Sequence, residues 1–484
     1  MIKAILFLLL TVLLNNIIAQ PTIESIMDSY KKDKDLQHAS YSFCIMEAQS
    51  GKIIKELNSE LSLVPASTMK IVTTSAALGI LGKEYTYKTK FYNSFFIDTI
   101  KQKTLSILYV KGSGDPSLNS AYFNNNDSSF INYIVQKLKI GGLKKVTGNV
   151  VVDNTCFDNK IPDTWIWSDI GNYFGAGANG LSYRDNKFSV YLNSSAQNLD
   201  VELADVKPIF YKNLLKINTF VKSSGTEDDA FVYGDPYSYT PRKITGTIPP
   251  NKHNYEIEAE APLPHLYFAS ELSQALQKNN LQDPFHYFND IDHKEDVISN
   301  DKLIYTHVSP SLEKIVYYTN IKSNNHYAES LLKTLGAVKS GGKGTTNNGV
   351  LAVENYWKER GIDVSGLHMV DGSGLSRANT ITTKIQATIL SKIYRDSLMY
   401  PAFNASLPVA GKNGSMSSLC KGTFAEGNMR AKTGYINRAR GYCGYVKTKT
   451  GKELAFSILF NNYNCSAKEM KLKIEKLLIA LTDL

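Results

Sequence analysis

The chain has 484 residues, of which 43% are hydrophobic and 20% charged, and its formal net charge is +9. This length accommodates two or three domains with full hydrophobic cores, and the basic residues are spread along the chain without the stripe or stacking module that nucleic-acid binding requires. The five cysteines are too few for a disulfide scaffold, and the eight histidines form no H-E-x-x-H motif. We therefore expect mostly buried thiols with one disulfide allowed, and no metal, cofactor or nucleic-acid partner.

Residues 1–19 have the pattern of a secretory signal peptide. Lys3 precedes an uninterrupted apolar run from Ala4 to Leu14, and Ala19 offers a small residue at a position suited to cleavage. The run is shorter than the roughly 20 residues of a membrane-spanning helix, which disfavours the alternative of an uncleaved anchor. The sequence thus predicts a mature chain that begins at Gln20, is exported to the periplasm or otherwise out of the cytoplasm, and has no stable transmembrane anchor.

The first candidate catalytic motif is S-x-x-K, from Ser67 to Lys70. An apolar segment continues from Met69 to Leu81 and stops at Gly82, which predicts a well-buried helix with the serine in its first turn. Residues three apart share one face of a helix, so Lys70 is expected beside Ser67. Other matches to S-x-x-K lack this setting, and they begin at Ser29, Ser311, Ser340 and Ser418.

The long stretch after this helix is rich in predicted strands. They lie at residues 105–110, 149–153, 188–192, 214–221 and 255–259. Turn sequences such as G-S-G-D-P and T-I-P-P-N separate them, and helical periodicity returns over residues 264–278. The stretch is therefore predicted to form a β-rich region of its own.

The second candidate motif is S-x-N, from Ser323 to Asn325, followed by helical periodicity over residues 325–335. Ser117 begins another S-x-N match. In the helix after the motif, Glu329 is predicted either to support the S-x-N loop or to be a solvated helix residue. The later segment D-G-S-G-L-S-R, residues 371–377, is predicted to be a tight loop near the cleft with a structural role favoured over direct contact.

The third candidate motif is K-T-G, which occurs at Lys432 and again at Lys449. Residues 440–446 and 453–459 have strand patterns, and the polar segment between them has Gly451 where a hairpin turn needs a positive φ. Lys449 is therefore predicted to be a solvated turn lysine. The motif that begins at Lys432 lies instead at the start of a preceding strand, which makes it the catalytic candidate.

The three motifs, in this order along the chain, are the signature of active-site serine enzymes that attack penicillins and D-Ala-D-Ala peptides. Serine is a weak nucleophile at its free pKa and needs an adjacent base, which Lys70 offers to Ser67. The reaction also needs fixed donors for the oxyanion and for the substrate carboxylate, and the motifs at Ser323 and Lys432 supply polar groups for them.

Over nearly the whole mature chain, the sequence resembles the D-alanyl-D-alanine carboxypeptidase/endopeptidase family of low-molecular-mass penicillin-binding proteins, class C, of the penicillin-binding protein 4 type. The resemblance is carried by P-A-S-T-M-K at 65–70, G-S-G-D-P at 112–116, S-N-N with the following A-E at 323–329, D-G-S-G-L-S-R at 371–377 and A-K-T-G at 431–434. The family usually continues K-T-G with threonine, whereas this chain has Tyr435. A contribution from the backbone N–H at that position survives this change, but a side-chain hydroxyl contact does not survive unaltered.

The resemblance implies an α+β fold with a β-lactamase/transpeptidase-like domain, in which a mainly antiparallel sheet is flanked by helices. The large gap between the first two motifs indicates an insertion, because compact β-lactamase-like domains place these motifs much closer together. We predict a discontinuous catalytic domain of residues 20–89 and 290–484. It is interrupted by an inserted β-rich region of residues 90–289, with two subdomains.

The resemblance also suggests the catalytic roles. Ser67 would attack the D-Ala-D-Ala carbonyl, and Lys70 would be the base if burial and the Lys432 ammonium lower its pKa. Ser323 would relay a proton to the leaving amine, and the N–H groups of Ser67 and Tyr435 would bind the oxyanion. Which lysine is the base is disputed in this enzyme class.

The remaining residues are expected to bind substrate. Asn325 would hold the amide of the acyl side chain, and Lys432 and Thr433 would bind the terminal carboxylate, with Gly434 and Tyr435 completing this edge of the site. The predicted protein is an exported serine D-Ala-D-Ala carboxypeptidase or endopeptidase that needs no cofactor, hydrolyses peptidoglycan peptides and is inhibited covalently by β-lactams. The alternatives are a β-lactamase, a non-catalytic penicillin-binding cell-wall sensor and a broad serine esterase.

Overall fold

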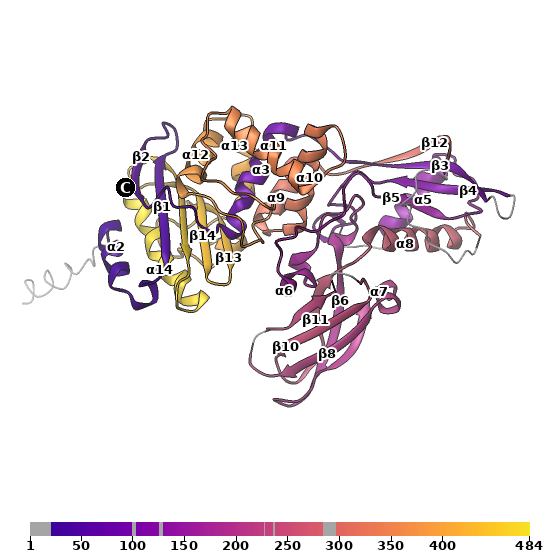
Figure 1. Ribbon diagram of the computed structural model, residues 1–484, viewed down its shortest axis with the longest axis horizontal. Helices are drawn as coiled ribbons and strands as arrows, with labels where there is room; N and C mark the ends of the chain where they lie inside the picture. The colour runs from indigo at the N-terminus through magenta and orange to yellow at the C-terminus, as the bar shows by residue number, and fades with distance from the viewer. Residues whose placement is uncertain (1–20, 99–102, 125–128, 227, 236–237, 284–296) are drawn as a thin grey trace, which may run out of the picture.

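The computed structural model describes residues 21–98, 103–124, 129–226, 228–235, 238–283 and 297–484. The predicted signal peptide, residues 1–19, and the predicted boundary near residue 290 lie outside these ranges. Figure 1 shows a body of sheet and helices that contains both the first and the last described segments, with further sheets extending away from it. The boundaries of the discontinuous domain stay a prediction.

The main sheet has five antiparallel strands in the order β13-β14-β15-β1-β2. Its strands are β1 (Ser40–Glu47), β2 (Ile53–Leu57), β13 (Arg430–Ile436), β14 (Ala439–Lys447) and β15 (Glu453–Asn461). The first strand of the chain pairs with the last, with Ser40 opposite Asn461. The predicted α+β class with an antiparallel sheet is therefore confirmed.

Helices cover both faces of this sheet because its side chains alternate between two cores. Along β15, Phe456 and Ile458 pack with the terminal helices on one face, whereas Ala455 and Leu459 pack with a second layer of helices on the other. The terminal helices are α2 (Ile23–Lys32) and α14 (Ala467–Ala480). The opposite layer contains α3 (Lys70–Leu81), α9 (Leu312–Ile321), α10 (Asn325–Ser340), α11 (Thr346–Glu359), α12 (Thr383–Tyr394) and α13 (Tyr400–Ser406).

The described residues between 88 and 308, which include the stretch predicted to be inserted (90–289), form three further sheets around a second hydrophobic core, and β12 lies beyond the predicted boundary of that stretch. One sheet has the order β12-β3-β4-β5, with β3 (Lys88–Asp98), β4 (Lys103–Lys111), β5 (Val150–Asp153) and β12 (Val297–Val308). A second has the order β11-β6-β7, with β6 (Lys187–Ser194), β7 (Glu202–Lys207) and β11 (Lys252–Glu260). The third has the order β8-β10-β9, with β8 (Lys216–Ser223), β9 (Phe231–Gly234) and β10 (Pro241–Ile248).

Each of the five strands predicted in this stretch overlaps an observed strand, and the helix predicted over residues 264–278 is α8 (Pro264–Lys278). The other helices described there are α4 (Ala121–Asn124), α5 (Ser129–Ile140), α6 (Trp167–Ile170) and α7 (Ile209–Leu214). In the first sheet, β12 pairs with β3, so that Val308 lies opposite Lys88. This pair of strands brings the chain out to the inserted stretch and back to α9.

Candidate active site

Ser67 lies in a short 3-10 helix, η2 (Ala66–Met69), which runs directly into α3. The backbone of β13 lies against the start of η2, and Gly434 permits this approach. A Cβ atom on Gly434 would lie 2.5 Å from the carbonyl oxygen of Pro65 and 3.0 Å from the backbone nitrogen of Ser67. The S-x-x-K and K-T-G motifs are thus brought into direct contact.

Lys70 is fully buried and points at Ser67. Its Nζ donates to Ser67 Oγ at 3.0 Å, to Asn325 Oδ1 at 2.6 Å and to the carbonyl oxygen of Ser373 at 2.7 Å. One amine therefore links the first motif, the second motif and the 371–377 loop.

The second and third motifs meet through a separate contact. Ser323 lies in the turn between α9 and α10 with a φ of 55°, in the left-handed region that residues other than glycine rarely adopt. Its Oγ accepts a hydrogen bond of 2.9 Å from Lys432 Nζ, which also donates to the carbonyl oxygen of Thr433 at 2.7 Å. The strained turn points the hydroxyl of Ser323 at the lysine of K-T-G.

Both lysines of the site have lowered pKa values. Burial lowers the pKa of Lys70 well below its usual value, the Lys432 ammonium lowers it further, and Asp371 and Glu329 oppose the shift. Burial also lowers the pKa of Lys432, to about 7, with Cys443 opposing. A buried lysine in this state can hold a free lone pair near neutral pH, which is the property that a general base needs.

The inserted stretch contributes to the site through α10. Asn325 Nδ2 donates to the carbonyl oxygen of Phe174 at 2.7 Å, and the next residue, His326, contacts Ser182 Oγ through Nε2 at 2.8 Å. Phe174 and Ser182 both belong to the stretch between β5 and β6. Sequence patterns do not reveal such a contact, because it depends on where a distant loop folds back.

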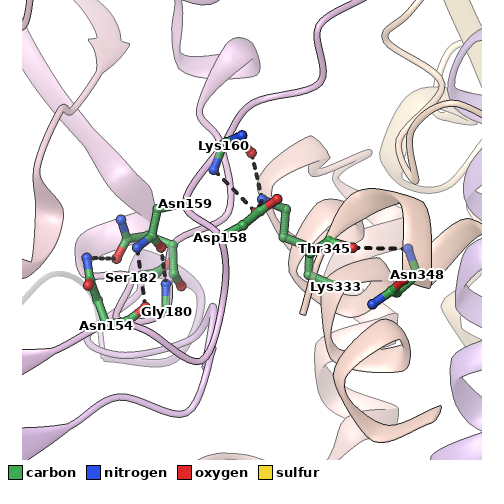
Figure 2. A network of polar contacts seen from close by, with 10 residues as sticks. Asn154, Asp158, Asn159, Lys160, Gly180, Ser182, Lys333, Thr345 and Asn348 are labelled. Carbon is green, nitrogen blue, oxygen red and sulfur yellow. Dashed lines mark hydrogen bonds and ion pairs between the residues drawn. The ribbon is translucent and has the colours of Figure 1, made fainter. Parts of the chain in front are cut away.

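A buried cation fastens the same stretch to the middle of α10. In Figure 2, Lys333 points from α10 toward Asp158 and Lys160, and its Nζ donates to Asp158 Oδ1 and to the carbonyl oxygen of Lys160, both at 2.6 Å. On the same side of the figure as Asn154, the side chain of Asn159 accepts from the Gly180 N–H at 2.9 Å. The helix that starts with Asn325 is therefore bound to the inserted stretch at its first turn and at its middle.

The outer edge of the site is formed by β13, an edge strand of the main sheet. The Ala431 N–H points away from β14 and donates to the Pro408 carbonyl oxygen, so by alternation the backbone N–H groups of Thr433 and Tyr435 face the same open edge. Thr433 Oγ1 lies 2.7 Å from Ser415 Oγ, a neighbour that sequence reasoning missed.

The Tyr435 side chain points to solvent. It is 51% exposed, and the guanidinium of Arg440 lies 5.1 Å from the centre of its ring. The residue that replaces the family's usual threonine therefore keeps its backbone on the site edge while its ring packs outside.

The 371–377 loop is held by two buried carboxylates. Glu329 accepts hydrogen bonds from the backbone N–H groups of Gly372 and Ser373, and Asp371 accepts from those of Gly374 and Ser376. The sequence left two interpretations open for Glu329. The solvated one is wrong, since only 1% of the residue is exposed, and the carboxylate supports the 371–377 loop and not the S-x-N loop. The structural role predicted for the loop agrees with its contacts.

The second K-T-G motif lies elsewhere. Lys449 is in the turn between β14 and β15, Gly451 has a φ of 91° there, and the Lys449 ammonium forms an ion pair of 2.5 Å with Asp483.

All five cysteines are free thiols. Within the described ranges, no group of His, Cys, Asp and Glu side chains is arranged to hold a metal ion. No helix in the described part of the chain has the length and apolar character to cross a membrane.

Gly434→Ala is expected to damage the site by pushing β13 away from η2. The added methyl group overlaps the Pro65 carbonyl, so we expect a loss of about 1–3 kcal/mol in the free energy of unfolding and a severalfold slower acylation of Ser67 by penicillin. Thermal unfolding and labelling with a fluorescent penicillin measure the two effects. Gly342→Ala is the control, because a Cβ there meets only Ser340 Oγ, at 3.8 Å. Equal behaviour of the two variants would contradict the close approach.

The comparisons with known proteins agree with this geometry. The model of the D-Ala-D-Ala carboxypeptidase 3 (S13) family matches residues 23–482. The D-alanyl-D-alanine carboxypeptidase of Actinomadura sp. (strain R39) is 26% identical over 460 residues, which are 90% of this chain and 80% of the relative. The crystal structure of penicillin-binding protein 4 (dacB) from Haemophilus influenzae superposes with a TM-score of 0.78 at 20% identity, covering 95% of this chain and 99% of that one.

A second structure of the Haemophilus influenzae protein, complexed with a β-lactam, superposes with a TM-score of 0.73 at 19% identity and the same coverage of both chains. The structural similarity shows that the fold is shared. Membership of the family is shown by the family model, which spans nearly the whole chain. The chain belongs to the D-Ala-D-Ala carboxypeptidase 3 (S13) family of serine-type peptidases.

Proposed function

We propose that this protein is exported and cleaves D-Ala-D-Ala stem peptides and peptide cross-links of peptidoglycan through an acyl-enzyme on Ser67, which penicillins also acylate. The observation that carries the proposal is the position of Lys70, whose buried Nζ lies 3.0 Å from Ser67 Oγ while its pKa is strongly lowered. A neutral amine in that place can take the proton of the hydroxyl as the oxygen attacks.

Acylation begins at the D-Ala-D-Ala carbonyl. Ser67 Oγ forms a bond to the carbonyl carbon as its proton passes to Lys70 Nζ, and the oxyanion is bound by the backbone N–H groups of Ser67 and Tyr435. The close contact between Gly434 and η2 supports this pair of donors, since it brings the two backbone segments together. Fixed donors of this kind stabilise charge that develops only in the transition state.

Departure of D-alanine needs a proton on its nitrogen. Ser323 Oγ accepts from Lys432 Nζ and is suited to pass a proton to the leaving amine, which breaks the C–N bond and leaves the acyl group on Ser67. Ser323 is reprotonated by Lys432, and the proton that Lys70 took from Ser67 makes good this loss, so that both lysines return to their starting states. Water then attacks the ester: its oxygen bonds to the acyl carbon, its proton goes to Ser67 Oγ, and the shortened peptide leaves.

Substrate binding uses the same polar groups. In this proposal, Lys432 and Thr433 bind the terminal carboxylate, and the hydrogen bond between Thr433 Oγ1 and Ser415 Oγ orients the Thr433 hydroxyl. An amide nitrogen carries two hydrogens, so Asn325 Nδ2 can keep its bond to the Phe174 carbonyl and still donate to a carbonyl of the acyl part of the substrate. This sharing makes the inserted stretch part of the binding wall.

Three measurements test the proposal. Release of D-alanine from a D-Ala-D-Ala peptide tests the carboxypeptidase reaction, and digestion of purified muropeptides, with products identified by mass, tests cleavage of cross-links. Fractionation of cells that express the full chain tests export. Muropeptides whose cross-links stay intact would limit the activity to the carboxypeptidase reaction.

The alternatives predict different results. A β-lactamase would turn over nitrocefin quickly, whereas the proposed enzyme is expected to stay labelled by penicillin. A non-catalytic penicillin-binding sensor would bind penicillin without releasing D-alanine. A broad esterase would hydrolyse simple esters and leave D-Ala-D-Ala peptides intact. Covalent labelling together with D-alanine release supports the proposed enzyme and none of the three alternatives.

Lys432→Ala is expected to slow acylation by about a hundredfold or more, because it removes a fixed cation from a buried site where charge develops. Lys449→Ala removes the same side chain from the other K-T-G motif, in the solvent-facing turn, and is expected to leave acylation near the wild-type rate. The second-order rate of penicillin acylation measures both. A comparable loss in the two variants, or a larger one at Lys449, would overturn the assignment of the motif.

A further inference from the structure

Four ionisable side chains lie in one buried cluster behind the serine. Lys70, Lys432, Glu329 and Asp371 are each at most 1% exposed. Three charged groups shift the pKa of Lys70, and they come from different segments: Lys432 from β13, Glu329 from α10 and Asp371 from the 371–377 loop. Water cannot screen such charges, so each of them acts strongly on the protonation of Lys70.

Glu329 and Lys70 both bind the backbone of Ser373: Glu329 binds its N–H group and Lys70 binds its carbonyl oxygen. Glu329 Oε1 accepts from the Ser373 N–H at 2.8 Å and from the Gly372 N–H at 3.0 Å. The carbonyl oxygen of Ser373 accepts from Lys70 Nζ at 2.7 Å. The carboxylate therefore fixes the residue whose carbonyl holds the amine.

Asp371 holds the rest of the loop and receives one contact from the inserted stretch. Its carboxylate accepts from the N–H groups of Gly374 and Ser376, each at 2.7 Å, and from Asn379 Nδ2 at 2.8 Å. The indole Nε1 of Trp165 donates to the same carboxylate at 2.9 Å in a buried contact. Trp165 lies between β5 and α6, far along the chain from the loop that it supports.

We propose that Glu329 and Trp165 are positioning residues for the catalytic amine. Glu329 sets the pH at which Lys70 loses its proton, and Trp165 lets the inserted stretch hold the loop whose carbonyl orients that amine. The proposal rests on the function proposed above, in which Lys70 acts on Ser67. It gives the inserted stretch a part in catalysis besides its contact with Asn325.

The electrostatic direction follows from the sign of the charges. An ionised Glu329 stabilises the Lys70 ammonium and raises the pKa of Lys70, in opposition to burial and to Lys432. Burial, with Asp371 beside it, raises the pKa of Glu329 to about 7. Loss of the Glu329 charge should therefore let Lys70 lose its proton at a lower pH.

Glu329→Gln tests this directly, because an amide oxygen in the place of Oε1 can still accept from both loop N–H groups, and only the longer contact of the Gly372 N–H with Oε2, at 3.2 Å, is lost. The midpoint of the Lys70 titration, read from the side-chain resonances of 13C-lysine-labelled protein and assigned with Lys70→Ala, is expected to move down by about one pH unit. The acid limb of penicillin acylation should move with it, while the plateau rate stays within a few fold of wild type. Glu359→Gln, an exposed carboxylate at the end of α11, is the control.

Asp371→Asn removes the other carboxylate that faces Lys70 and is expected to move the Lys70 midpoint in the same direction. The result therefore does not depend on one variant being folded. A midpoint that stays in place or rises in both variants would overturn the role of Glu329. The NMR titration needs no turnover, so it tests this inference in any preparation, whereas a wild-type protein that penicillin does not label would contradict only the proposed function.

Trp165→Phe and Trp167→Phe form a matched pair. Trp167 donates through Nε1 to the Gly234 carbonyl oxygen, within the inserted stretch. Trp165→Phe is expected to lower the plateau of acylation by about tenfold, as small displacements of reacting groups do, and to leave the pH midpoint in place. Trp167→Phe should keep the plateau. Equal plateaus in the two variants would overturn the role of Trp165.

Discussion

Ser67→Ala is expected to abolish both D-alanine release and covalent labelling by penicillin while the protein stays folded. The hydroxyl is the only group of the serine that can form the acyl bond, and no neighbouring side chain replaces it at the start of η2. Lys70 loses one acceptor but keeps Asn325 Oδ1 and the Ser373 carbonyl. A single lost hydrogen bond costs on the order of 1 kcal/mol of stability, and no side chain caps η2.

Fluorescent penicillin on a denaturing gel measures the labelling, and circular dichroism with a melting curve checks the fold. Ser340→Ala, at the end of α10 and in a different S-x-x-K match, is the control and should label normally. Labelling that persists in Ser67→Ala would show that another residue is the nucleophile, and the mechanism proposed above would then be wrong.

Lys70→Arg is expected to be nearly as inactive as Lys70→Ala, although it keeps a positive charge on a side chain of similar length. A guanidinium stays protonated in proteins, so it can donate to Ser67 Oγ but cannot take the proton. General-base assistance typically contributes a factor of about 10²–10⁴, and we expect losses of that size in both variants. The second-order rate of penicillin acylation from about pH 5 to pH 10 measures them.

In the wild-type protein, the same measurement should give a rate that rises as Lys70 loses its proton and falls as acid restores it. The pKa of Lys432 is lowered to about 7, so its ammonium is lost above neutral pH, and the rate is expected to decline again on the alkaline side. An arginine variant that keeps most of the wild-type rate would show that Lys70 acts as a cation only. The base would then have to reach Ser67 by another path, through Ser323.

The local parts of the site could be predicted from sequence because short-range geometry decides them. Helical spacing alone places Lys70 beside Ser67. A polar turn that contains Gly451 identifies Lys449 as a turn lysine and not a site lysine. The start of the helix differs from the prediction, because Ser67 lies in a 3-10 helix that precedes α3. The segment begins at Ala66 as the 3-10 helix η2, and Ala66 has a φ of 49°, in the left-handed region.

The parts that could not be predicted are contacts between distant segments. Phe174 meets Asn325 through a backbone carbonyl, which every residue has, so no side-chain pattern could mark it. No sequence pattern predicts the contact of Ser415 with Thr433 either. Glu329 could be recognised as a candidate but not placed, because a glutamate in the first turns of a helix is usually solvated and only the fold shows that this one is buried.

The pairing of β1 with β15 has a consequence for synthesis of the protein. The strands β1 and β2 and the serine segment are made early, but a two-stranded hairpin is at best marginally stable alone, and the partner of β1 is among the last parts of the chain to be translated. At about 5–20 residues per second, the interval lasts tens of seconds. A nascent or truncated chain that ends before β15 therefore carries Ser67 without the assembled site, and we expect penicillin to label only the finished chain.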